Sequence, residues 1–401
     1  MTTPEWVAPG EQGFLVGDSL YFRAIELGDA AFSAAWRFSP YPITRQRAEK
    51  MLKEELAKQD IGASNSYIAC RRDDDVPVGA ITVNEADRRT ASLKIRVDPA
   101  LGRPAAAVMA EMLRIVVPWL ATERNSMVIW VELDGPEPEV VAALAAIGMR
   151  PAVRLREAIW RDGARVDQWV YEYLHPFWRD LLGDPGAGIE HATEPGDVAP
   201  AGRRVSVAHL AGPGPKNAIL VSDRLALRLT EPEDAKLIAK LIRAETEPGW
   251  GRGRWLLSPL HIEHWIEEDT KDDPPGAIFL AVIRRESGEL IGEVELTGID
   301  WFNRTAETGS VIYHPALRGQ GIGSEAKHLL LEYAFDHLGL HMLKSFVWSF
   351  NTRSQAALRK QGYRDAGRMQ WRAQASTGFA PNYVFDLLAS EWRNRVGPHV
   401  G

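Results

Sequence analysis

The chain has 401 residues, of which 45% are hydrophobic and 25% charged, and its formal net charge is −7. Because domains cluster near ~100–200 residues, this length predicts two domains. The acidic balance argues against general nucleic-acid binding, which needs a basic face. No uninterrupted apolar run reaches the ~20 residues that cross a bilayer, and residues 1–6 lack the basic start and apolar core of a secretory signal. We therefore expect a cytoplasmic protein without a membrane partner.

Cysteine and histidine usage gives no sign of a metal site. The one cysteine, Cys70, excludes an internal disulfide framework and a cysteine-rich metal site. It lies in the apolar run 67–70, where a buried structural thiol is expected. The pair His261 and His264 has no third ligand at a suitable spacing, so we expect no zinc site and no metal cofactor.

The first elements of the chain recur later in the sequence. Residues 15–30 align with residues 220–235 without a gap, and eight of the sixteen positions are identical. Both segments predict a strand followed by a capped helix. Later landmarks keep nearly the same offset, among them the Pro-Ala-Leu sequences at 99–101 and 315–317. The sequence therefore predicts two copies of one fold, at residues 1–182 and 217–401.

A stretch rich in glycine and proline, 183–216, separates the two copies and predicts a linker. It could still be ordered against the domains, because residues 205–207 could add a short strand. Just before the linker, residues 169–174 predict the last strand of the first copy, matching residues 382–387 of the second.

The second copy alternates strands and helices. Its apolar periodicity predicts a strand at 219–230, helices near 233–245 and 259–269, strands at 277–284, 290–299 and 305–314, a helix at 324–337, a strand at 343–349, a helix at 352–361 and closing strands near 363–373 and 381–388.

A glycine-rich loop joins the strand that ends near 314 to the helix that begins near 324. Glycines at 319, 321 and 323 let the backbone turn tightly and bring bare N–H groups to the helix N-terminus, where the macrodipole favours negative charge. Such turns also join strands to helices where no ligand binds. As a binding loop it would hold a pyrophosphate, and the candidate ligands are Arg318, Gly319, Gln320, Gly321, Ile322 and Gly323.

A second motif follows the loop at a fixed distance. Asn351 and Ser354 open a helix that ends at Gly362 and Tyr363. With the loop, these residues resemble the GNAT superfamily of acyl-CoA-dependent acyltransferases, and most closely its RimJ/RimL-like branch, over about residues 218 to 390. The resemblance implies an α/β (α+β) fold with a mixed, mostly antiparallel sheet flanked by helices. It also implies acetyl-CoA or another acyl-CoA as co-substrate, held where two central strands splay apart.

The first copy departs from this pattern. Its loop, residues 102–107, has alanine where the second copy has Gly321 and Gly323, and Pro104 removes an N–H donor. Glu137 and Val140 stand where the second copy has its asparagine and serine. We therefore expect one donor site, in the second copy, and a degenerate first copy that is structural or shapes the acceptor site.

The resemblance implies roles for several residues. Backbone groups of Val311, Ile312 and Tyr313 would pair with the pantetheine amides, and an N–H of that strand would face the thioester oxygen. Asn351 would contact the pantetheine arm or orient a water, although it could equally be a plain helix cap. Ser354 would protonate the leaving thiolate, with Tyr363 as the alternative donor.

The general base has three candidates. Glu307 shares a strand face with Val311, and Glu293 and Glu295 share one face of the preceding strand. A carboxylate in a partly desolvated cleft would have a raised pKa. Each could instead be a solvated charge. Some relatives carry a carboxylate after the Gly-Tyr strand, where this chain has Trp-Arg-Ala at 371–373.

Aromatic residues mark the expected acceptor side, and aromatic density suits a ring or a cation. They could instead fill the contact between the two copies. The candidates are Trp250, Trp255, His261, Trp265 and Trp301.

The leading hypothesis is therefore an N-acyltransferase acting on the primary amine of a small molecule or a protein N-terminus by direct attack. The alternative is a non-catalytic acyl-CoA-binding or scaffold protein. The third hypothesis is a nucleic-acid-binding module, which the negative net charge of the chain disfavours. The sequence leaves the oligomeric state open.

Overall fold

The computed structural model describes residues 14–57, 64–87, 89–102, 104–194, 217–244, 256–375 and 378–396. The chain divides into two compact units. The first comprises Met1–Val153 and Gln168–Glu190, and the second comprises Arg154–Asp167 and His191–Gly401. The second unit thus includes a short segment from the middle of the chain, which the sequence boundaries did not anticipate.

The first unit contains strands β1 to β5 and the parts of β6 and β7 that lie before Arg154 and after Asp167. The strand order is β1-β2-β3-β4-β5-β7-β6 among the described residues. Strands β4 and β5 pair in parallel, from Thr90↔Val128 to Leu93↔Val131. The elements are β1 Leu20–Ala24, α1 Ser33–Trp36, α2 Arg45–Ala57, β2 Ser64–Arg71, β3 Pro77–Asp87, β4 Thr90–Val97, α3 Pro104–Thr122, β5 Val128–Asp134, α4 Pro138–Ala146, β6 Arg150–Arg161, β7 Ala164–Leu174 and α5 Pro176–Leu182.

Helix α3 is the most apolar helix of the first unit. Of the described helices, it is the one that is long and apolar enough to cross a membrane by length and composition. Its residues Met112, Leu113, Val116 and Leu120 are buried in the main core of the unit, together with side chains of the sheet. Packing against the sheet accounts for this composition.

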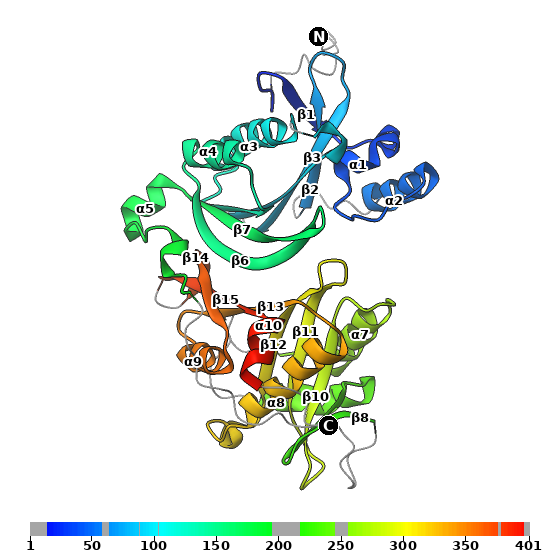
Figure 1. Cartoon of the computed structure of the whole chain (residues 1–401), viewed down its shortest axis with the longest axis vertical. Helices are drawn as coiled ribbons and strands as arrows, with labels where there is room; N and C mark the ends of the chain where they lie inside the picture. The colour runs from blue at the N-terminus through cyan, green and yellow to red at the C-terminus, as the bar shows by residue number, and fades with distance from the viewer. Residues whose placement is uncertain are drawn as a thin grey trace. The chain divides into compact units, whose positions relative to one another are not determined.

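The second unit carries the loop and motif singled out above (Figure 1). Its elements are β8 Ala218–Val221, β9 Leu225–Leu229, α6 Ala235–Arg243, α7 Pro259–Thr270, β10 Ile278–Arg284, β11 Leu290–Asp300, β12 Thr305–Ile312, α8 Ile322–Glu332, β13 Met342–Trp348, α9 Thr352–Gln361, β14 Arg364–Ala375, β15 Gly378–Leu388 and α10 Ala389–Val396.

The sheet of the second unit has the strand order β14-β15-β13-β12-β11-β10-β9-β8. Every described pair in it is antiparallel except β12 with β13. A mixed, mostly antiparallel sheet with flanking helices was the fold class expected from the sequence, and it is confirmed.

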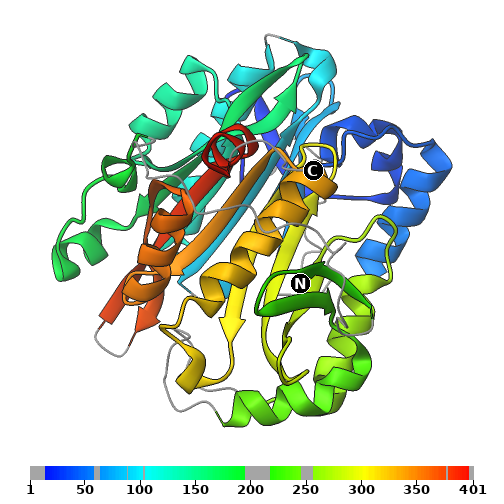
Figure 2. The same cartoon turned by 60° about the horizontal axis from the view of Figure 1, so that its bottom comes forward.

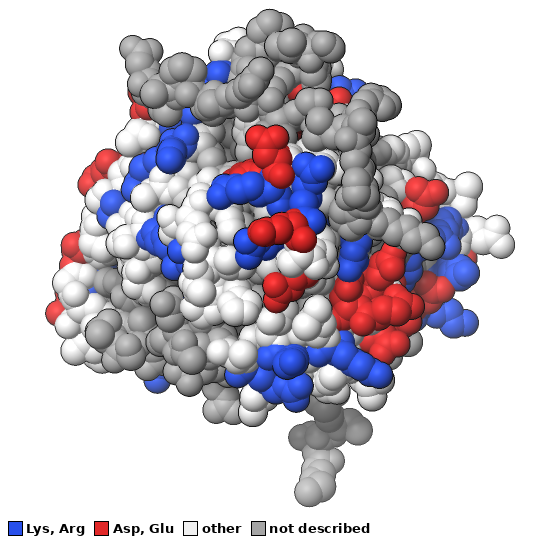
Figure 3. All heavy atoms as spheres, turned by 90° about the horizontal axis from the view of Figure 1, so that it is seen from below, with Lys and Arg blue, Asp and Glu red and all other residues white. Residues whose placement is uncertain are grey.

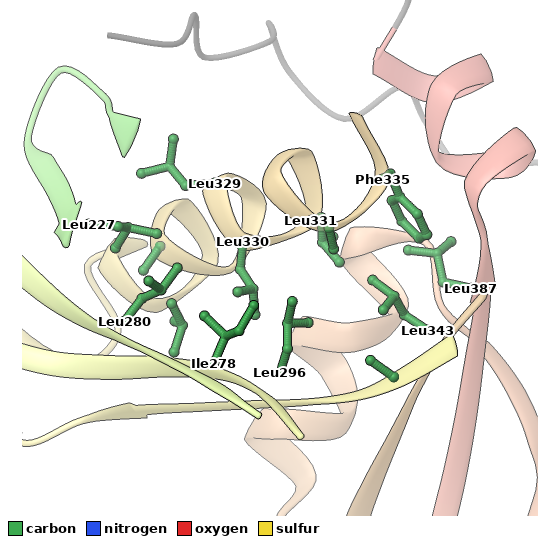
Figure 4. Packing of buried hydrophobic residues seen from close by; sticks show 14 of the residues in the cluster. Leu227, Ile278, Leu280, Leu296, Leu329, Leu330, Leu331, Phe335, Leu343 and Leu387 are labelled. Carbon is green, nitrogen blue, oxygen red and sulfur yellow. The ribbon is translucent and has the colours of Figure 1, made fainter. Parts of the chain in front are cut away.

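Helix α8 covers one face of this sheet (Figure 2). Leu330 of α8 points toward Leu280 and Ile278 of the strands, and Phe335, in the turn after α8, lies beside Leu343 and Leu387 (Figure 4). The opposite face packs against α6 and α7 through a second cluster that includes Tyr313. Alternate residues of β9 and β10 therefore serve two separate cores.

Most elements of the second unit agree with their predicted extents to within three residues, and two differ in form. The predicted strand 219–230 is a hairpin of β8 and β9, because Ser222 N–H donates to Leu225 O at 2.8 Å and closes a turn. Helix α8 begins at Ile322, earlier than predicted, and its last part is a π-helical turn, Tyr333–His337.

The short segment Arg154–Asp167 is bound within the second unit by a buried ion network. Arg156 donates to Asp386 at 2.8 Å and to Glu391 at 2.5 Å. Arg364 donates to Asp386 at 2.6 Å, and Asp386 is fully buried. Burial would raise the pKa of Asp386, but hydrogen bonds from both arginines outweigh it and lower that pKa.

Candidate active site

The sheet of the second unit opens between β12 and β13. The two strands pair over a short stretch, from Thr305↔Met342 to Glu307↔Lys344. Beyond it β12 continues to Ile312 along β11, while β13 continues along β15. Within the described strands, the edge of β12 after Glu307 therefore has no ladder partner on the β13 side.

Backbone groups along β12 alternate between its two sides. Tyr313 N–H donates to Ile291 O at 3.0 Å and is used in the pairing with β11. The two-residue alternation places the backbone of Val311 on that same side and turns Ser310 and Ile312 toward the open edge. Of the three residues expected to pair with a pantetheine arm, Ile312 lies at this edge, and Ser310 joins it.

Two side chains bond to carbonyls along the open edge. Arg318 Nε donates to Ile312 O at 2.9 Å, and Ser345 Oγ donates to Thr308 O at 3.0 Å. These bonds confirm that the alternate residues of β12 face away from β11. An incoming group with amide donors and acceptors would meet the same edge.

The glycine loop follows this strand after a short 3-10 turn, Pro315–Leu317. Gly319 and Gly321 have φ values of 78° and 80°, which residues with a Cβ rarely adopt. Gly321 is the N-cap of α8, so the first N–H groups of the helix point out of its N-terminus. Gln320 is turned away, because its Nε2 donates to Ala316 O at 2.7 Å. The loop has the geometry of an anion site, as the sequence predicts.

Arg224, from the turn before β9, adds a cation beside the loop. Its Nη1 donates to Gln320 O at 3.2 Å, and its Nε donates to Glu325 of α8 at 2.7 Å. Ser222 Oγ donates to the other oxygen of Glu325 at 2.5 Å. These bonds tie the β8–β9 turn to the first turn of α8. Sequence reasoning missed Arg224, because the aligned position of the first copy is a serine.

Of the three candidate bases, Glu293 is the most enclosed. It accepts hydrogen bonds from Thr230 Oγ1 at 2.8 Å and from Tyr313 Oη at 3.0 Å. Burial raises the pKa of Glu293 and also that of Tyr313. With one bond to each carboxylate oxygen, Glu293 is held as part of the packing between β11, β12 and β9.

Glu295 lies across β12. It pairs in register with Gly309. A Cβ built on Gly309 would lie 2.6 Å from both Cδ and Cγ of Glu295, and closer still to its Oε1. The side chain of Glu295 therefore fills the space that a side chain at position 309 would take. Glu307 lies one step earlier on the same strand face, at the last pair before β12 and β13 separate.

Lys327 is a buried cation on α8, with 3% of its surface exposed. Burial lowers the pKa of Lys327 to about 7, against the opposing influence of the Glu295 and Glu307 carboxylates. Sequence reasoning missed Lys327, although a lysine within the apolar stripe of α8 was a visible signal.

The second motif places its residues on α9 and just after it. Asn351 is the N-cap of α9, and its Oδ1 accepts from Ser354 N–H at 3.1 Å, which is the helix-cap alternative. Ser354 is partly exposed in the first helical turn. Tyr363 is buried, and its hydroxyl lies 2.9 Å from Thr308 Oγ1 of β12. Burial raises the pKa of Tyr363.

A cavity of about 390 Å³ opens beside the candidate bases. Its lining residues Phe279 and Thr297 are the register partners of Glu295 and Glu307. The full lining is Trp265, Glu268, Asp272, Gly276, Ala277, Phe279, Thr297 and Gly298.

The predicted acceptor residues are spread around this cavity. Trp265 is 51% exposed and lines it, and the ring of His261 lies 6.1 Å from that of Trp265. Trp301 is partly buried, and its Nε1 donates to Pro275 O at 2.8 Å, so it packs beside the cavity. Trp250 and Trp255 lie outside the described residues.

Comparison with known proteins bears on the same half of the chain. Residues 224–364 match the family described as "Acetyltransferase (GNAT) domain". "Putative ribosomal N-acetyltransferase YdaF" of Bacillus subtilis (strain 168) is 27% identical over 43% of this chain and 95% of its own. "Uncharacterized N-acetyltransferase p20" of Bacillus licheniformis is 30% identical over 43% of this chain and 97% of its own. A spermidine N-acetyltransferase from Vibrio cholerae, solved with CoA and spermine, is 22% identical with a TM-score of 0.39, covering 43% of this chain and 99% of its own.

The match with the Bacillus licheniformis protein extends over nearly all of that relative. The family match, over residues 224–364, includes both the glycine loop and the Asn-x-x-Ser motif. The chain therefore belongs to the GNAT acetyltransferases and is an acyl-CoA-dependent N-acetyltransferase.

Proposed function

We propose that the protein transfers the acetyl group of acetyl-CoA to the primary amine of a small cationic molecule. One observation carries the donor side of this proposal. The strand whose edge is open, β12, leads through one short 3-10 turn into the glycine loop at the N-terminus of α8. A ligand with amides followed by a pyrophosphate would bind the edge and then the loop in that order.

The residues that would hold acetyl-CoA are those of this edge and loop. Ser310 and Ile312 would offer backbone groups to the pantetheine amides. The N–H groups of the first turn of α8, with Arg224 and Arg318 beside them, would take the pyrophosphate. Arg318 would first have to leave Ile312 O, to which it now donates.

Glu295 would act as the general base. Its carboxylate lies over Gly309, past the point where β12 and β13 separate. As the amine nitrogen bonds to the thioester carbonyl carbon, Glu295 would take the proton that the nitrogen loses. The carbon–sulfur bond then breaks. Ser354, at the positive end of α9, would pass a proton to the thiolate and recover one from solvent.

The cavity beside these carboxylates supports a cationic acceptor. Trp265 and Phe279 give it aromatic walls, and Glu268 and Asp272 give it carboxylates. Such walls attract an ammonium group by cation–π and charge interactions. Glu268 is partly neutralised by Lys271 at 2.5 Å, so Asp272 is the stronger candidate contact.

A protein N-terminus is the second candidate acceptor, and the name of the Bacillus subtilis relative favours it. Nucleic acid is not proposed as a partner. The face shown in Figure 3 gathers acidic side chains into a patch beside scattered basic ones. Binding to a phosphate backbone would require a continuous basic surface instead.

Steady-state CoA release with acetyl-CoA and matched amines tests this function. We expect 1,4-diaminobutane to exceed n-butylamine in kcat/KM by about tenfold or more, because the second ammonium group would use the cavity. Asp272→Asn should reduce this ratio and leave the rate with n-butylamine unchanged. A faster reaction with a short peptide bearing a free N-terminus would favour the second candidate. Absence of amine-dependent CoA release with every acceptor would contradict the proposal.

A further inference from the structure

We propose that Gly309 is a positioning residue for the reaction, because its missing side chain lets the Glu295 carboxylate lie across β12 at the opening of the sheet. This inference rests on the proposed role of Glu295 as general base and adds to it a residue that binds neither substrate. It explains why the carboxylate can occupy this place at all.

The geometry leaves no alternative use of the space. Gly309 and Glu295 are register partners on neighbouring strands and share one face of the sheet. A Cβ on residue 309 would lie 2.6 Å from Cγ and Cδ of Glu295. Real Cβ atoms do not approach other carbons so closely, so any side chain at 309 would move the carboxylate away.

The contact between Glu295 and Gly309 lies where β12 and β13 have just separated. The ladder with β13 ends at Glu307, two residues before Gly309. Side chains of β11 normally stand upright from the sheet, over their own strand. Lying over Gly309 instead, Glu295 reaches toward the edge at which Ser310 faces the opening.

Lys327 lies within electrostatic range of Glu295. The carboxylates that act on this buried ammonium group are those of Glu295 and Glu307. Lys327 belongs to α8, which packs on the face of the sheet that carries Val294 and Leu296. Glu295 alternates with Val294 and Leu296 along β11, so its charge acts on Lys327 from the opposite face of the sheet.

A double-mutant cycle with Gly309→Ala and Glu295→Ala tests the inference. In the native background, Gly309→Ala should lower kcat by about tenfold or more and lower the Tm, while the KM for acetyl-CoA changes less than about twofold. In the Glu295→Ala background the space is empty, so adding Gly309→Ala should change neither the Tm nor the residual rate. Gly28→Ala is the matched control, because a Cβ there meets nothing within 4 Å.

The outcomes separate this inference from the proposed function. If Glu295→Ala keeps native activity, Glu295 is not the general base. The positioning role proposed for Gly309 is then also wrong. If Glu295→Ala is inactive while Gly309→Ala is fully active, Glu295 remains the base and the inference about Gly309 is overturned. Equal losses from Gly309→Ala in both backgrounds would also overturn it, since the effect would then be independent of Glu295.

Discussion

At the scale of single residues, the buried ammonium group of Lys327 links stability to pH. Its pKa in the folded protein is about 7, below the usual value of 10.5. The unfolded chain therefore binds more protons between these two values. Stability contributed through this group rises as the pH rises from about 7 toward 10.5.

Lys327→Met should remove this dependence. At pH 6.5 the variant should be more stable than the native protein by on the order of a few kcal/mol, because no charge has to be buried. The difference should shrink toward pH 10. Urea unfolding at several pH values measures it, with the exposed helix residue Lys240 changed to methionine as the control. If the extra stability of Lys327→Met were the same at every pH, the lowered pKa of Lys327 would be wrong.

The two candidate proton donors should respond differently to removal of their hydroxyl groups. Ser354→Ala should lower kcat by about tenfold or more, because it removes the donor at the positive end of α9. Tyr363→Phe should reduce stability by about 1 kcal/mol through loss of its bond with Thr308 and change kcat by less than about threefold. Single-turnover rates and urea unfolding check both. The reverse order of rate effects would assign the proton to Tyr363.

At the scale of elements, the N-terminus of α8 should depend on glycine in a way that is specific to acetyl-CoA. Gly321→Ala places a Cβ at a φ of 80° and should raise the KM for acetyl-CoA by about tenfold, because the loop N–H groups would shift. Gly339→Ala is the matched control: its φ is 67°, and a Cβ there meets nothing within 4 Å. Both variants should lose about 1 kcal/mol of stability. If Gly321→Ala and Gly339→Ala raised the KM for acetyl-CoA equally, the rise would not be specific to the loop at the N-terminus of α8.

Helix α9 shows how much local sequence can specify. Its predicted extent, 352–361, agrees with the observed Thr352–Gln361, because Asn351 caps its start and Gly362, with a φ of 100°, ends it. Both signals lie within the helix or beside it. The hairpin of β8 and β9 was missed, because its turn at Ser222 lacks the glycine or proline that marks most turns.

The candidate site was predictable only in part. The glycine loop and the Asn-x-x-Ser motif are contiguous patterns, so the sequence could identify them. Choosing among Glu293, Glu295 and Glu307 requires the register of β11 against β12, and the contact of Glu295 with Gly309 exists only in that register. No spacing within either strand reveals it.

At the scale of the whole molecule, the two units share a strand order. Each has an antiparallel sheet with one parallel pair at its centre, β4 with β5 and β12 with β13 among the described strands. This supports the proposal of a duplicated fold. The first residue of α3 is Pro104, which offers no N–H, whereas the first residue of α8 is Ile322, which does.

Calorimetric titration of the full chain with CoA should therefore give one bound molecule per chain. Gly321→Ala should weaken that binding, because it alters the loop of the second unit. A second equivalent that persists in the Gly321→Ala variant would place a working donor site in the first unit.

The buried ion network should make the protein sensitive to acid. The pKa of Asp386 is lowered in the folded state, so the stability that it contributes is present at neutral pH and is lost as the pH falls through that value. Asp386→Asn should cost about 3–5 kcal/mol at pH 7, because Arg156 and Arg364 would keep their charges without the buried carboxylate. Chemical unfolding measures it. Glu54→Gln, which removes an exposed pair with Lys50, should cost under about 0.5 kcal/mol. If Glu54→Gln lowered the free energy of unfolding as much as Asp386→Asn, the buried ion network would have no special part in stability.

The membership of Arg154–Asp167 in the second unit has a consequence for anyone who would isolate that unit. A single cut in the glycine- and proline-rich stretch would yield a fragment without Arg156. Asp386 and Glu391 would then lose a guanidinium group that neutralises both. The acetyltransferase unit is thus formed by two separate segments of the chain. A fragment that begins at residue 217 should therefore be less stable than the same residues within the full chain.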